Sequence, residues 1–448
     1  MTRGLTYHAA VAALEERGRF GIRLGLGRTK ALLRELDHPE RALRGVLVGG
    51  TNGKGSVLAL AGSALRAAGL RVGETPKPHL VSYRERMQID GRPIAPKAFA
   101  RLVDEVLPIA DRVERRLGPP TEFELLTAML FKWFADERVE VAVVEVGLGG
   151  RLDATHAWDG GVATITNVAL DHMDRLGDTI PKIAREKAAI IERGDLAVTG
   201  ATGDGLAVIR RRARRVGAPL TEAPPAPLLA WDRDGLEVEL PLTGRTRVGL
   251  RGRHQAANVA VADAVLDSLG VAGIAEVGAD ARRGGYASAR WPGRLELVSV
   301  GGHDVLLDGA HNPAGAAALA VALDDLRPFL DGGAPGPLTL VVGAMADKDV
   351  SGIATALAGA GTLRGGRIIA TQVDLSRAMP ADELAAIWSR AAPEATVQAV
   401  ADVGRALDTA VAGATGPVVV AGSLYLVGEA RRRWVDDPAV RDPEVASR

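Results

Sequence analysis

Short apolar segments alternate with amphipathic segments along most of the chain. The mostly apolar run VEVAVVEV at 139–146 is typical of a strand buried on both faces of a parallel sheet. In the first half of the chain the pattern predicts strands at 71–73, 86–89, 139–146, 162–166 and 196–199, and helices at 7–17, 28–36, 96–117, 122–135, 179–191 and 205–216. Strands and helices in alternation predict parallel pairing, with helices on both faces of the sheet.

The rhythm changes at a proline-rich stretch, 223–229. The segments LEVELPL and TRVGL beyond it alternate apolar and polar residues, which predicts an antiparallel flap, followed by helices at 254–269 and 274–286. WPGRLE at 291–296 is interpreted as a hinge. A second alternating series follows it, with strands expected near 303–307, 338–342, 367–371, 396–399 and 417–421. We therefore predict an α/β protein with two doubly wound domains, 1–293 and 294–448, the second smaller and Rossmann-like.

Composition excludes several classes of function. The 448 residues include 55 Lys plus Arg and 55 Asp plus Glu, so a partner recognised by bulk charge, such as nucleic acid, is not expected. The absence of cysteine excludes disulfides, thiolate metal sites and a cysteine nucleophile. The first residues lack the apolar region of a signal peptide, and no window reaches the length of a membrane span. We predict a cytoplasmic protein with no membrane partner.

The segment VLVGGTNGKGSVL at 46–58 is a candidate phosphate-binding loop. It reads as a strand, a glycine-rich turn and a helix, an arrangement in which backbone N–H groups and the helix N-terminus converge on a polyphosphate. Lys54 would supply a mobile charge for the outer phosphates, and Thr51 or Ser56 a hydroxyl near a metal ion. The strict phosphate-loop pattern is not met, so a purely structural turn is the alternative.

Two further polar residues follow predicted strands. Glu145 stands near the end of the apolar run 139–146, and His172 follows the strand at 162–166 through the segment VALDH. Ligands of open α/β sheets bind beyond the carboxyl ends of the strands, where a carboxylate is well placed to hold Mg²⁺. Either residue alone could equally be a solvated or hydrogen-bonded side chain.

Short motifs that appear in order along the chain carry a resemblance to a known family. They are GTNGKGS (50–56), PHLVSYRERM (78–87), TEFE (121–124), EVGLGGRLDAT (145–155), LDH (170–172), EKA (186–188), HQAAN (254–258), WPGRLE (291–296), DGAHNP (308–313), DKD (347–349) and GSLYLVG (422–428). The set resembles the folylpolyglutamate synthases, often also dihydrofolate synthases, of the Mur ligase superfamily. The resemblance implies an N-terminal P-loop ATPase-like domain that binds ATP and pterin, and a C-terminal glutamate-ligase domain.

The resemblance also implies an activity, that of an ATP-dependent amide ligase. Such enzymes transfer the γ-phosphoryl group of ATP to a carboxylate, and the amine of glutamate then attacks the resulting acyl phosphate. It implies ATP and Mg²⁺ as cofactors, L-glutamate, dihydropteroate and reduced folates as substrates, and a monomer. The TEFE and RLDA segments favour both activities, on dihydropteroate and on reduced folates.

Roles for individual residues follow from the same resemblance. The implied catalytic residues are Lys54, Glu145, His172, Lys187, Asp308 and His311. The implied nucleotide contacts are Thr51, Asn52, Gly53, Lys54, Gly55, Ser56, Asn258, Arg294 and Asp308. The implied pterin and glutamate contacts are Thr121, Glu122, Phe123, Glu124, Leu152, Asp153, Ala154, His311 and Ser423. The implied metal ligands are Ser56, Glu145, His172 and a carbamylated Lys187. Without the resemblance, a surface Lys187 paired with a neighbouring carboxylate is the simpler interpretation.

Some positions depart from the family's usual pattern. Lys77 stands where the family has a metal-ligating serine, and a protonated ammonium cannot ligate Mg²⁺. Lys77 is expected either to swing away or to replace the charge of one of two metal ions. His156 replaces a usual asparagine, near the pterin or at the surface, and Ala189 should be benign. The basic run 209–215 is interpreted as a solvated helix face, with polyglutamate binding as the alternative.

Two other functions compete with this reading. A Mur-type ligase that acts on another carboxylate carries a further domain before the phosphate loop, and we expect the 49 preceding residues to be too few for one. A nucleotide-binding homologue impaired in catalysis would need only the phosphate loop, whereas this chain also keeps the candidate catalytic residues.

Overall fold

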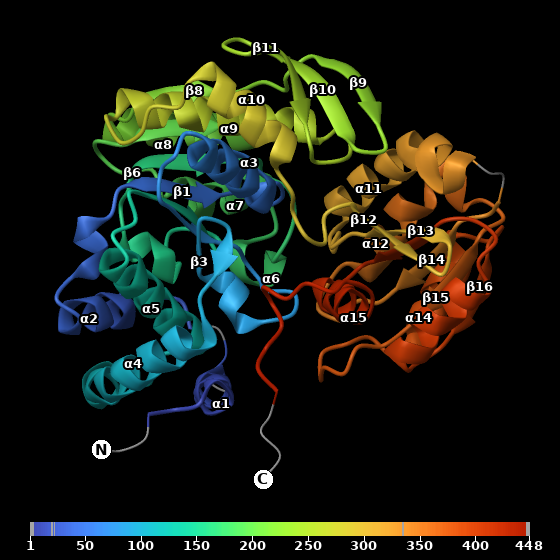
Figure 1. The fold of residues 1–448 in the computed structure, drawn as a ribbon, viewed down its shortest axis with the longest axis horizontal. Helices are drawn as coiled ribbons and strands as arrows, with labels where there is room; N and C mark the ends of the chain where they lie inside the picture. The colour runs from blue at the N-terminus through green and yellow to red at the C-terminus, as the bar shows by residue number, and fades with distance from the viewer. Residues whose placement is uncertain (1–3, 19–20, 22, 334–335, 445–448) are drawn as a thin grey trace.

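The protein has two lobes joined near residue 293 (Figure 1). The computed structural model describes residues 4–18, 21, 23–333 and 336–444. Within these residues the strands form three sheets, of eight, three and six strands. No helix in this part of the chain is long and apolar enough to cross a membrane.

The eight-stranded sheet forms the centre of the N-terminal lobe. Its strands in spatial order are β4 (Arg92–Pro93), β3 (Gln88–Ile89), β2 (Val72–Thr75), β5 (Val141–Glu145), β1 (Gly45–Gly49), β6 (Gly161–Ile165), β7 (Leu196–Thr199) and β8 (Leu220–Glu222). From β2 to β8 neighbouring strands pair in parallel, as predicted. The prediction of a parallel strand at 86–89 is wrong, because β3 pairs antiparallel with β2 and β4 at the sheet edge. A two-residue strand carries no period from which its direction can be predicted.

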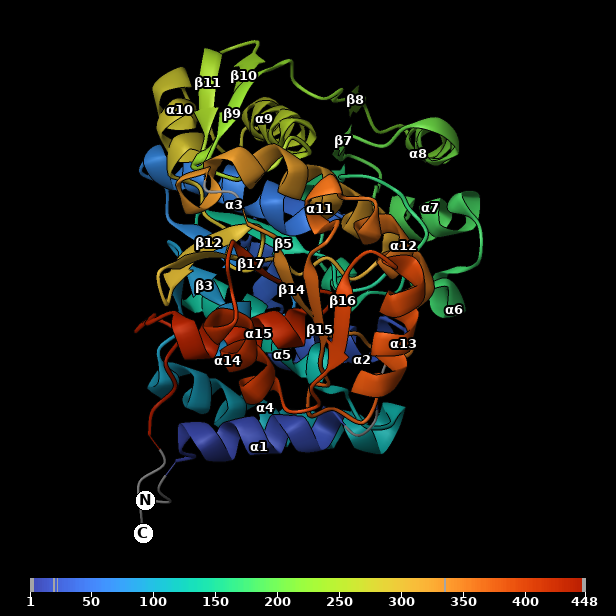
Figure 2. The ribbon, with the colours of Figure 1, turned by 90° about the vertical axis from the view of Figure 1, so that its right-hand side faces the viewer.

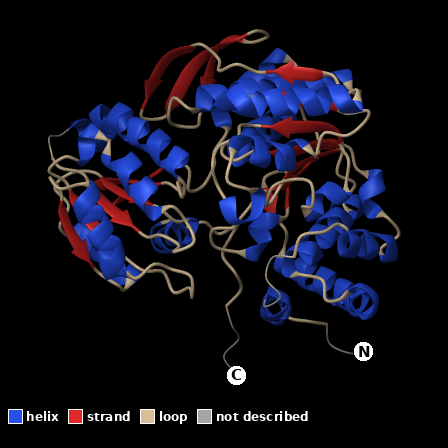
Figure 3. Cartoon of the chain, turned by 180° about the vertical axis from the view of Figure 1, so that it is seen from behind, coloured by secondary structure: helices blue, strands red, loops and turns tan. Residues whose placement is uncertain are grey.

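Helices cover both faces of this sheet, as Figure 3 shows from behind. Leu47 of β1 contributes to a core with α1 (Tyr7–Gly18), α2 (Gly27–Glu35), α4 (Pro96–Leu117) and α5 (Glu122–Asp136). Val46 and Val48 contribute to a second core with α3 (Lys54–Ala67), α9 (Gln255–Val271) and α10 (Ala279–Ser288). Successive strand side chains point to opposite faces. Burial on both faces therefore explains why β1 is apolar at consecutive positions.

The remaining helices of this lobe are shorter. They are α6 (Met173–Leu176), α7 (Ile180–Ala188), α8 (Gly203–Val216) and the 3-10 helices η1 (Pro39–Ala42), η2 (Tyr83–Arg86) and η3 (Ala154–Ala157). The helix predicted at 274–286 begins later, as α10 at Ala279. The predicted flap is a three-stranded antiparallel sheet of β9 (Leu228–Asp232), β10 (Gly235–Leu240) and β11 (Gly244–Val248). Strand β9 was not predicted, because it begins within the proline-rich stretch.

The C-terminal lobe is the second doubly wound unit. Its strands in spatial order are β12 (Glu296–Val300), β13 (His303–Leu307), β17 (Val418–Ala421), β14 (Thr339–Val342), β15 (Arg367–Ala370) and β16 (Thr396–Ala399). One face packs on α11 (Pro313–Leu326), α12 (Val350–Ala358) and α13 (Ala381–Ala391), the other on α14 (Val403–Ala412) and α15 (Leu424–Trp434). Figure 2 shows this sheet between its helices. The 3-10 helices η4 (Arg327–Gly333) and η5 (Gly361–Leu363) complete the lobe.

Two features of this lobe lie outside the predicted pattern. Strand β12 pairs antiparallel with β13 and is only half-buried at the sheet edge, so it carries no continuous apolar run. Beyond α15 the chain turns back to the N-terminal lobe, where His8 donates a hydrogen bond of 2.7 Å to the carbonyl of Pro443. Figure 1 shows this red tail running beside the N-terminal lobe toward α1.

Candidate active site

A cleft of about 620 Å³ lies between the lobes. Its wall includes Gly50 after β1, Val146 after β5, Asp308 after β13 and Gly422 after β17. These positions are the carboxyl ends of parallel strands in both sheets, where ligands of open α/β sheets bind. The two lobes therefore direct their strand ends into one shared space.

The glycine-rich turn begins this wall. Gly50 has φ of 141°, and a Cβ there would lie 1.9 Å from the Thr166 hydroxyl, so only glycine fits. The Thr166 hydroxyl donates to the carbonyl of Asn52 at 2.6 Å, and the Asn52 N–H donates to the Asn167 side chain at 2.9 Å. Helix α3 begins at Lys54. Thr166 and Asn167 thus hold the turn in place, and the turn leads directly into the N-terminus of α3.

Two lysines converge on this turn. Lys54 Nζ donates to the carbonyl oxygens of Gly50 at 3.2 Å and Thr51 at 3.0 Å, and lies 3.9 Å from Glu145 Oε1. Lys187 Nζ donates to the same Gly50 carbonyl at 2.8 Å. Burial, reinforced by the charge of Lys54, lowers the pKa of Lys187 to about 7. The simpler sequence interpretation of Lys187 as a surface residue is wrong, because it is 4% exposed.

A third lysine replaces the serine that the resemblance led us to expect. Lys77 lines the cleft. Its backbone N–H donates to the Glu145 carboxylate at 3.1 Å, its Nζ donates to the Glu145 carbonyl at 2.6 Å, and its Nζ lies 4.6 Å from the centre of the Phe123 ring. Burial lowers the pKa of Lys77 to about 8, although Asp153 and Glu145 oppose the shift. Burial raises the pKa of Glu145, against the charges of Lys54 and Lys77.

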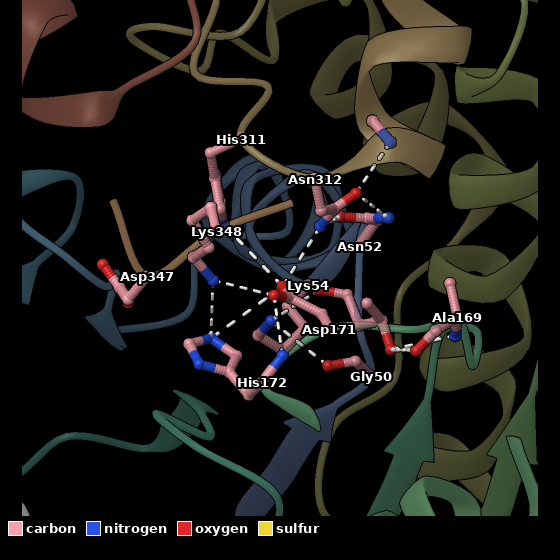
Figure 4. A network of polar contacts seen from close by, with 12 residues as sticks. Gly50, Asn52, Lys54, Ala169, Asp171, His172, His311, Asn312, Asp347 and Lys348 are labelled. Atoms are coloured by element: carbon pink, nitrogen blue, oxygen red, sulfur yellow. Dashed lines mark hydrogen bonds and ion pairs between the residues drawn. The ribbon is translucent and has the colours of Figure 1, made fainter. Parts of the chain in front are cut away.

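A network of polar side chains joins the lobes above the turn (Figure 4). Asn312 donates to Asn52 Oδ1 at 3.0 Å and to Asp171 at 3.1 Å, and Lys348 donates to Asp171 at 2.7 Å. Burial opposes the ionisation of Asp171, but His172 and Lys348 outweigh it and lower its pKa to about 2. Burial lowers the pKa of His172, with Asp171 opposing. Asp171 and Lys348 form an ion pair between the lobes.

Residues of the segments 121–124 and 147–154 form another part of the cleft wall in the N-terminal lobe, and several of their polar side chains bond within the protein. Thr121 accepts from the N–H of Glu124 at 3.3 Å, and Glu124 accepts from the N–H of Thr121 at 2.8 Å, which is a capping box at the start of α5. Glu124 also pairs with Arg28 at 2.9 Å. Asp153 accepts from the N–H groups of Leu148 and Thr155, at 2.8 and 3.0 Å. Asp153 and Glu124 Oε2, which belong to residues that the resemblance implies as ligand contacts, are therefore already bonded within the protein, whereas Glu124 Oε1 has no hydrogen-bond partner among the described residues.

The C-terminal lobe supplies the opposite wall. The Asp308 carboxylate accepts from the N–H groups of Leu295 and Ala310, each at 2.9 Å. His311 Nδ1 donates to the Gly309 carbonyl at 2.7 Å, and burial lowers the pKa of His311 to about 4, so the ring is neutral near pH 7. Ser423 caps α15 by accepting from the N–H of Tyr425 at 3.2 Å.

Every residue that the sequence predicted for the site lines the cleft, although the roles of these residues stay predictions. His156 and the basic run 209–215 are not among the lining residues; His156 contacts Glu192 at 3.1 Å. Sequence reasoning gave no role to several polar lining residues, of which Arg86, Asp171 and Lys348 stand inside quoted motifs and Arg377 in none. Across the described chain, no group of three or more His, Asp or Glu side chains could by itself hold a metal ion.

The chain is similar to known proteins in both sequence and structure. The Mur ligase middle domain matches residues 48–218, and the Mur ligase glutamate ligase domain matches residues 293–424. A dihydrofolate synthase/folylpolyglutamate synthase of Bacillus subtilis is 38% identical over 325 residues, covering 70% of this chain and 75% of that protein. The Mycobacterium tuberculosis protein of the same name is 35% identical over 460 residues, covering 92% and 90%. The crystal structure of Mycobacterium tuberculosis folylpolyglutamate synthase complexed with ADP and AMPPCP is 32% identical, with a TM-score of 0.83 and coverage of 96% and 100%.

Proposed function

The chain belongs to the folylpolyglutamate synthase and dihydrofolate synthase family of the Mur ligases, and from that premise we propose that its cleft adds L-glutamate both to reduced folates and to dihydropteroate. One observation carries the proposal. The phosphate-binding turn, the acceptor wall at 121–124 and the walls of the C-terminal lobe enclose a single cleft of about 620 Å³. That volume lies within the range of about 300–1,000 Å³ typical of ligand pockets.

The nucleotide would bind at the turn. The N–H groups of residues 53–56 and the N-terminus of α3 suit the phosphates, with Lys54 beside them. Lys54 now donates to two carbonyl oxygens, and a phosphate oxygen is a stronger, charged acceptor than either. Asn258, which lies beside Gly53 of the turn, and Arg294 and Asp308, which line the cleft, would contact the remainder of the nucleotide.

The residues at the turn also fit Mg²⁺. Glu145 offers a buried carboxylate, and His172 and Ser56 line the same cleft. Mg²⁺ usually takes only one or two carboxylates and completes its shell with substrate phosphates and water, so the lack of a cluster of three ligands is compatible with it. When bound, the ion would neutralise charge on the phosphoryl group being transferred.

Lys187 would contribute to this site as a carbamate. Lys187 is 4% exposed, and its amine donates to the Gly50 carbonyl. With a pKa of about 7, much of the amine is neutral near pH 7, and the neutral amine is the form that attacks CO₂. The new N–C bond forms as the amine loses a proton, and an anionic oxygen donor replaces a cation. Incorporation of isotope-labelled bicarbonate at Lys187 would test this step.

The reaction would proceed in two displacements. An oxygen of the acceptor carboxylate attacks the γ-phosphorus of ATP, the bond to the bridging oxygen breaks, and ADP leaves. The glutamate amine then attacks the acyl phosphate carbonyl, phosphate leaves, and the nitrogen loses a proton. Lys54 would stabilise charge during the first step. His311 and Ser423, on the C-terminal wall, would position the incoming glutamate.

Lys77 deepens this assignment, because its charge would replace that of one metal ion beside Glu145. Its Nζ lies 2.6 Å from the Glu145 carbonyl, where it repels a second cation. Metal titration of the activity of the wild type and of Lys77→Ser tests whether the Lys77 charge replaces a metal ion. A different metal requirement in the variant supports the replacement, and the same requirement contradicts it.

The proposed function is tested by phosphate release with ATP, Mg²⁺ and glutamate, with dihydropteroate and tetrahydrofolate monoglutamate as alternative acceptors. Turnover with both supports the proposal, and turnover with one restricts it to that step. ATP binding without turnover on either would favour a catalytically impaired homologue or a ligase for another carboxylate. A monomeric state and a cytoplasmic location stay predictions from the sequence.

A further inference from the structure

The loop 76–87 between β2 and β3 carries Lys77, Pro78 and Arg86 to the cleft wall. Several hydrogen bonds within the loop hold its turn together. The Glu85 carboxylate accepts from the backbone N–H groups of Leu80, Val81 and Ser82, at 3.0, 2.7 and 2.7 Å. The loop is a compact turn, so what holds it against the rest of the protein decides where its cleft residues lie.

One support comes from the C-terminal lobe. A Cβ on Gly428 of α15 would lie 2.2 Å from the Leu80 carbonyl oxygen, so the helix and the loop are in close contact. Arg432, also on α15, donates to the Val81 carbonyl at 3.3 Å. The loop therefore touches α15 although it belongs to the other lobe.

The second support is the tail that follows α15. Asp442 Oδ1 accepts from the Ser82 hydroxyl at 2.6 Å and from Arg84 Nε at 3.3 Å. Arg84 Nη2 donates to the Arg441 carbonyl at 2.8 Å. Near its start the tail is held by Arg431, which donates to Asp437 at 2.9 Å. The tail thus runs from α15 to the loop and is bonded at both ends.

The groups that the tail contacts are buried. Arg84 is 4% exposed and Ser82 is 1% exposed. Asp442 is the carboxylate that the structure pairs with Arg84 in the described chain. Removal of one partner leaves a buried guanidinium without its counter-charge, which is strongly unfavourable. The tail therefore helps to hold the loop, together with the Tyr7 hydroxyl, which lies 3.2 Å from the Ser82 hydroxyl, and the Ile94 carbonyl, which accepts from Arg84 at 3.2 Å.

We propose that Asp442 is a positioning residue for the ligase reaction, because it helps to fix the loop that places Arg86 in the cleft and Lys77 between Glu145 and Phe123 of the acceptor wall. The inference rests on the proposed function for its kinetic part. The phosphate-binding turn has separate supports, in Thr166 and Asn167. Loss of the tail contact would consequently disturb the acceptor more than the nucleotide.

The test is Asp442→Ala in the full chain, with Asp436→Ala as the matched control. Asp436 is an exposed carboxylate in the same tail, and its side chain is 75% exposed beside Arg441. Backbone amide exchange in 76–87 should rise about tenfold or more in Asp442→Ala, and the KM for the folate acceptor should rise about tenfold. ADP affinity should change less than about twofold, since the turn is supported elsewhere. Asp436→Ala should match the wild type in all three.

Ser82→Ala, which keeps the Asp442–Arg84 pair, is the second variant should Asp442→Ala fail to fold. It should give a smaller rise in exchange confined to the same loop. Unchanged exchange in the loop, or equal losses of ADP and acceptor affinity with no rise specific to the loop, would overturn the proposal. Backbone amide exchange can be measured whether or not the protein turns over any folate. A loop that opens in a protein inactive on every folate would therefore count against the proposed function and in favour of the positioning role.

Discussion

In the half of the cleft around residues 50–56, the lysines donate to backbone carbonyls, whereas in the half around 121–124 and 147–154 the polar side chains bond one another. Lys54 and Lys187 share the Gly50 carbonyl, and neither has a hydrogen-bonded carboxylate. In the second half, Asp153 accepts from two backbone N–H groups. Glu124 Oε2 accepts from the N–H of Thr121 and pairs with Arg28, while Glu124 Oε1 has no hydrogen-bond partner among the described residues. The lysine charges of the first half are therefore available to a ligand, whereas the carboxylate charges of the second half are largely compensated by donors within the protein.

This difference bears on the role of the TEFE motif at 121–124. Thr121 and Glu124 line the cleft, yet their polar atoms form the cap of α5. Phe123 and Leu152 are left to present apolar surface to a ligand. A planar heterocycle would thus be bound by shape and apolar contact, while polyphosphate would be bound by charge.

The largest expected effect on activity is at Lys54, in the half of the cleft around residues 50–56. Lys54→Met should lower kcat by about 10³-fold, because a fixed positive charge is lost where phosphoryl charge develops. The unfolding free energy should change much less, since Lys54 donates to carbonyl oxygens and its ion pair with Glu145 is long, at 3.9 Å. Steady-state kinetics and chemical denaturation measure the two quantities. Lys97→Met, at an exposed position, is the control, and a kcat near that of the wild type would contradict the assignment.

In the half of the cleft around residues 121–124, substitution of a carboxylate should affect the stability of the protein more than its activity. Glu124→Ala removes a 3% exposed carboxylate from Arg28 and should lower the unfolding free energy by about 3 kcal/mol. Denaturant unfolding measures it, with Asp136→Ala at the exposed end of the same helix expected within about 0.5 kcal/mol of the wild type. An unaltered stability with a large loss of kcat would mean that Glu124 acts directly on substrate.

Lys77 lies where the two halves meet, and its titration sharpens the comparison. Its pKa is about 8 in the folded chain against 10.5 as the ordinary value, so the unfolded chain binds more protons between those pH values. The unfolding free energy of the wild type should therefore rise through that window relative to Lys77→Met, by up to about 1.4 kcal/mol per pH unit. Parallel pH curves for wild type and variant would show that Lys77 is not desolvated as described. Lys30→Met, an exposed lysine, should run parallel to the wild type.

The smallest effect concerns the helix cap. Thr121→Ala should lower the unfolding free energy by about 1 kcal/mol, whereas Thr121→Ser keeps the hydroxyl and should cost much less. Thermal unfolding of the three proteins compares them. Equal stabilities together with a raised acceptor KM in Thr121→Ala would assign Thr121 to the ligand instead of the cap.

Much of the architecture follows from local pattern. The strand at 196–199 and the helix at 96–117 have the predicted bounds, because each is a continuous apolar or amphipathic run. Strands β3 and β12 were misassigned or missed, since both are short or half-buried at an edge where burial imposes little pattern.

The candidate site could be predicted as a set of residues but not as a set of contacts. Asp171 and Lys348 are 177 residues apart, and Ser82 and Asp442 are 360 apart. Such pairs leave no periodic signal in the sequence. The double use of Glu124, as a cleft residue and as half of a capping box, likewise becomes visible only once Arg28 and Thr121 are placed beside it.

The most direct measurement is calorimetric titration of ADP and of dihydropteroate, each at two salt concentrations and two temperatures. If one half binds by charge and the other by shape, ADP affinity should fall with salt and in Lys54→Met. Dihydropteroate affinity should depend little on either, and its binding should show the larger negative heat-capacity change. Dihydropteroate binding that weakens with salt as steeply as ADP binding, with no larger heat-capacity change, would contradict the account.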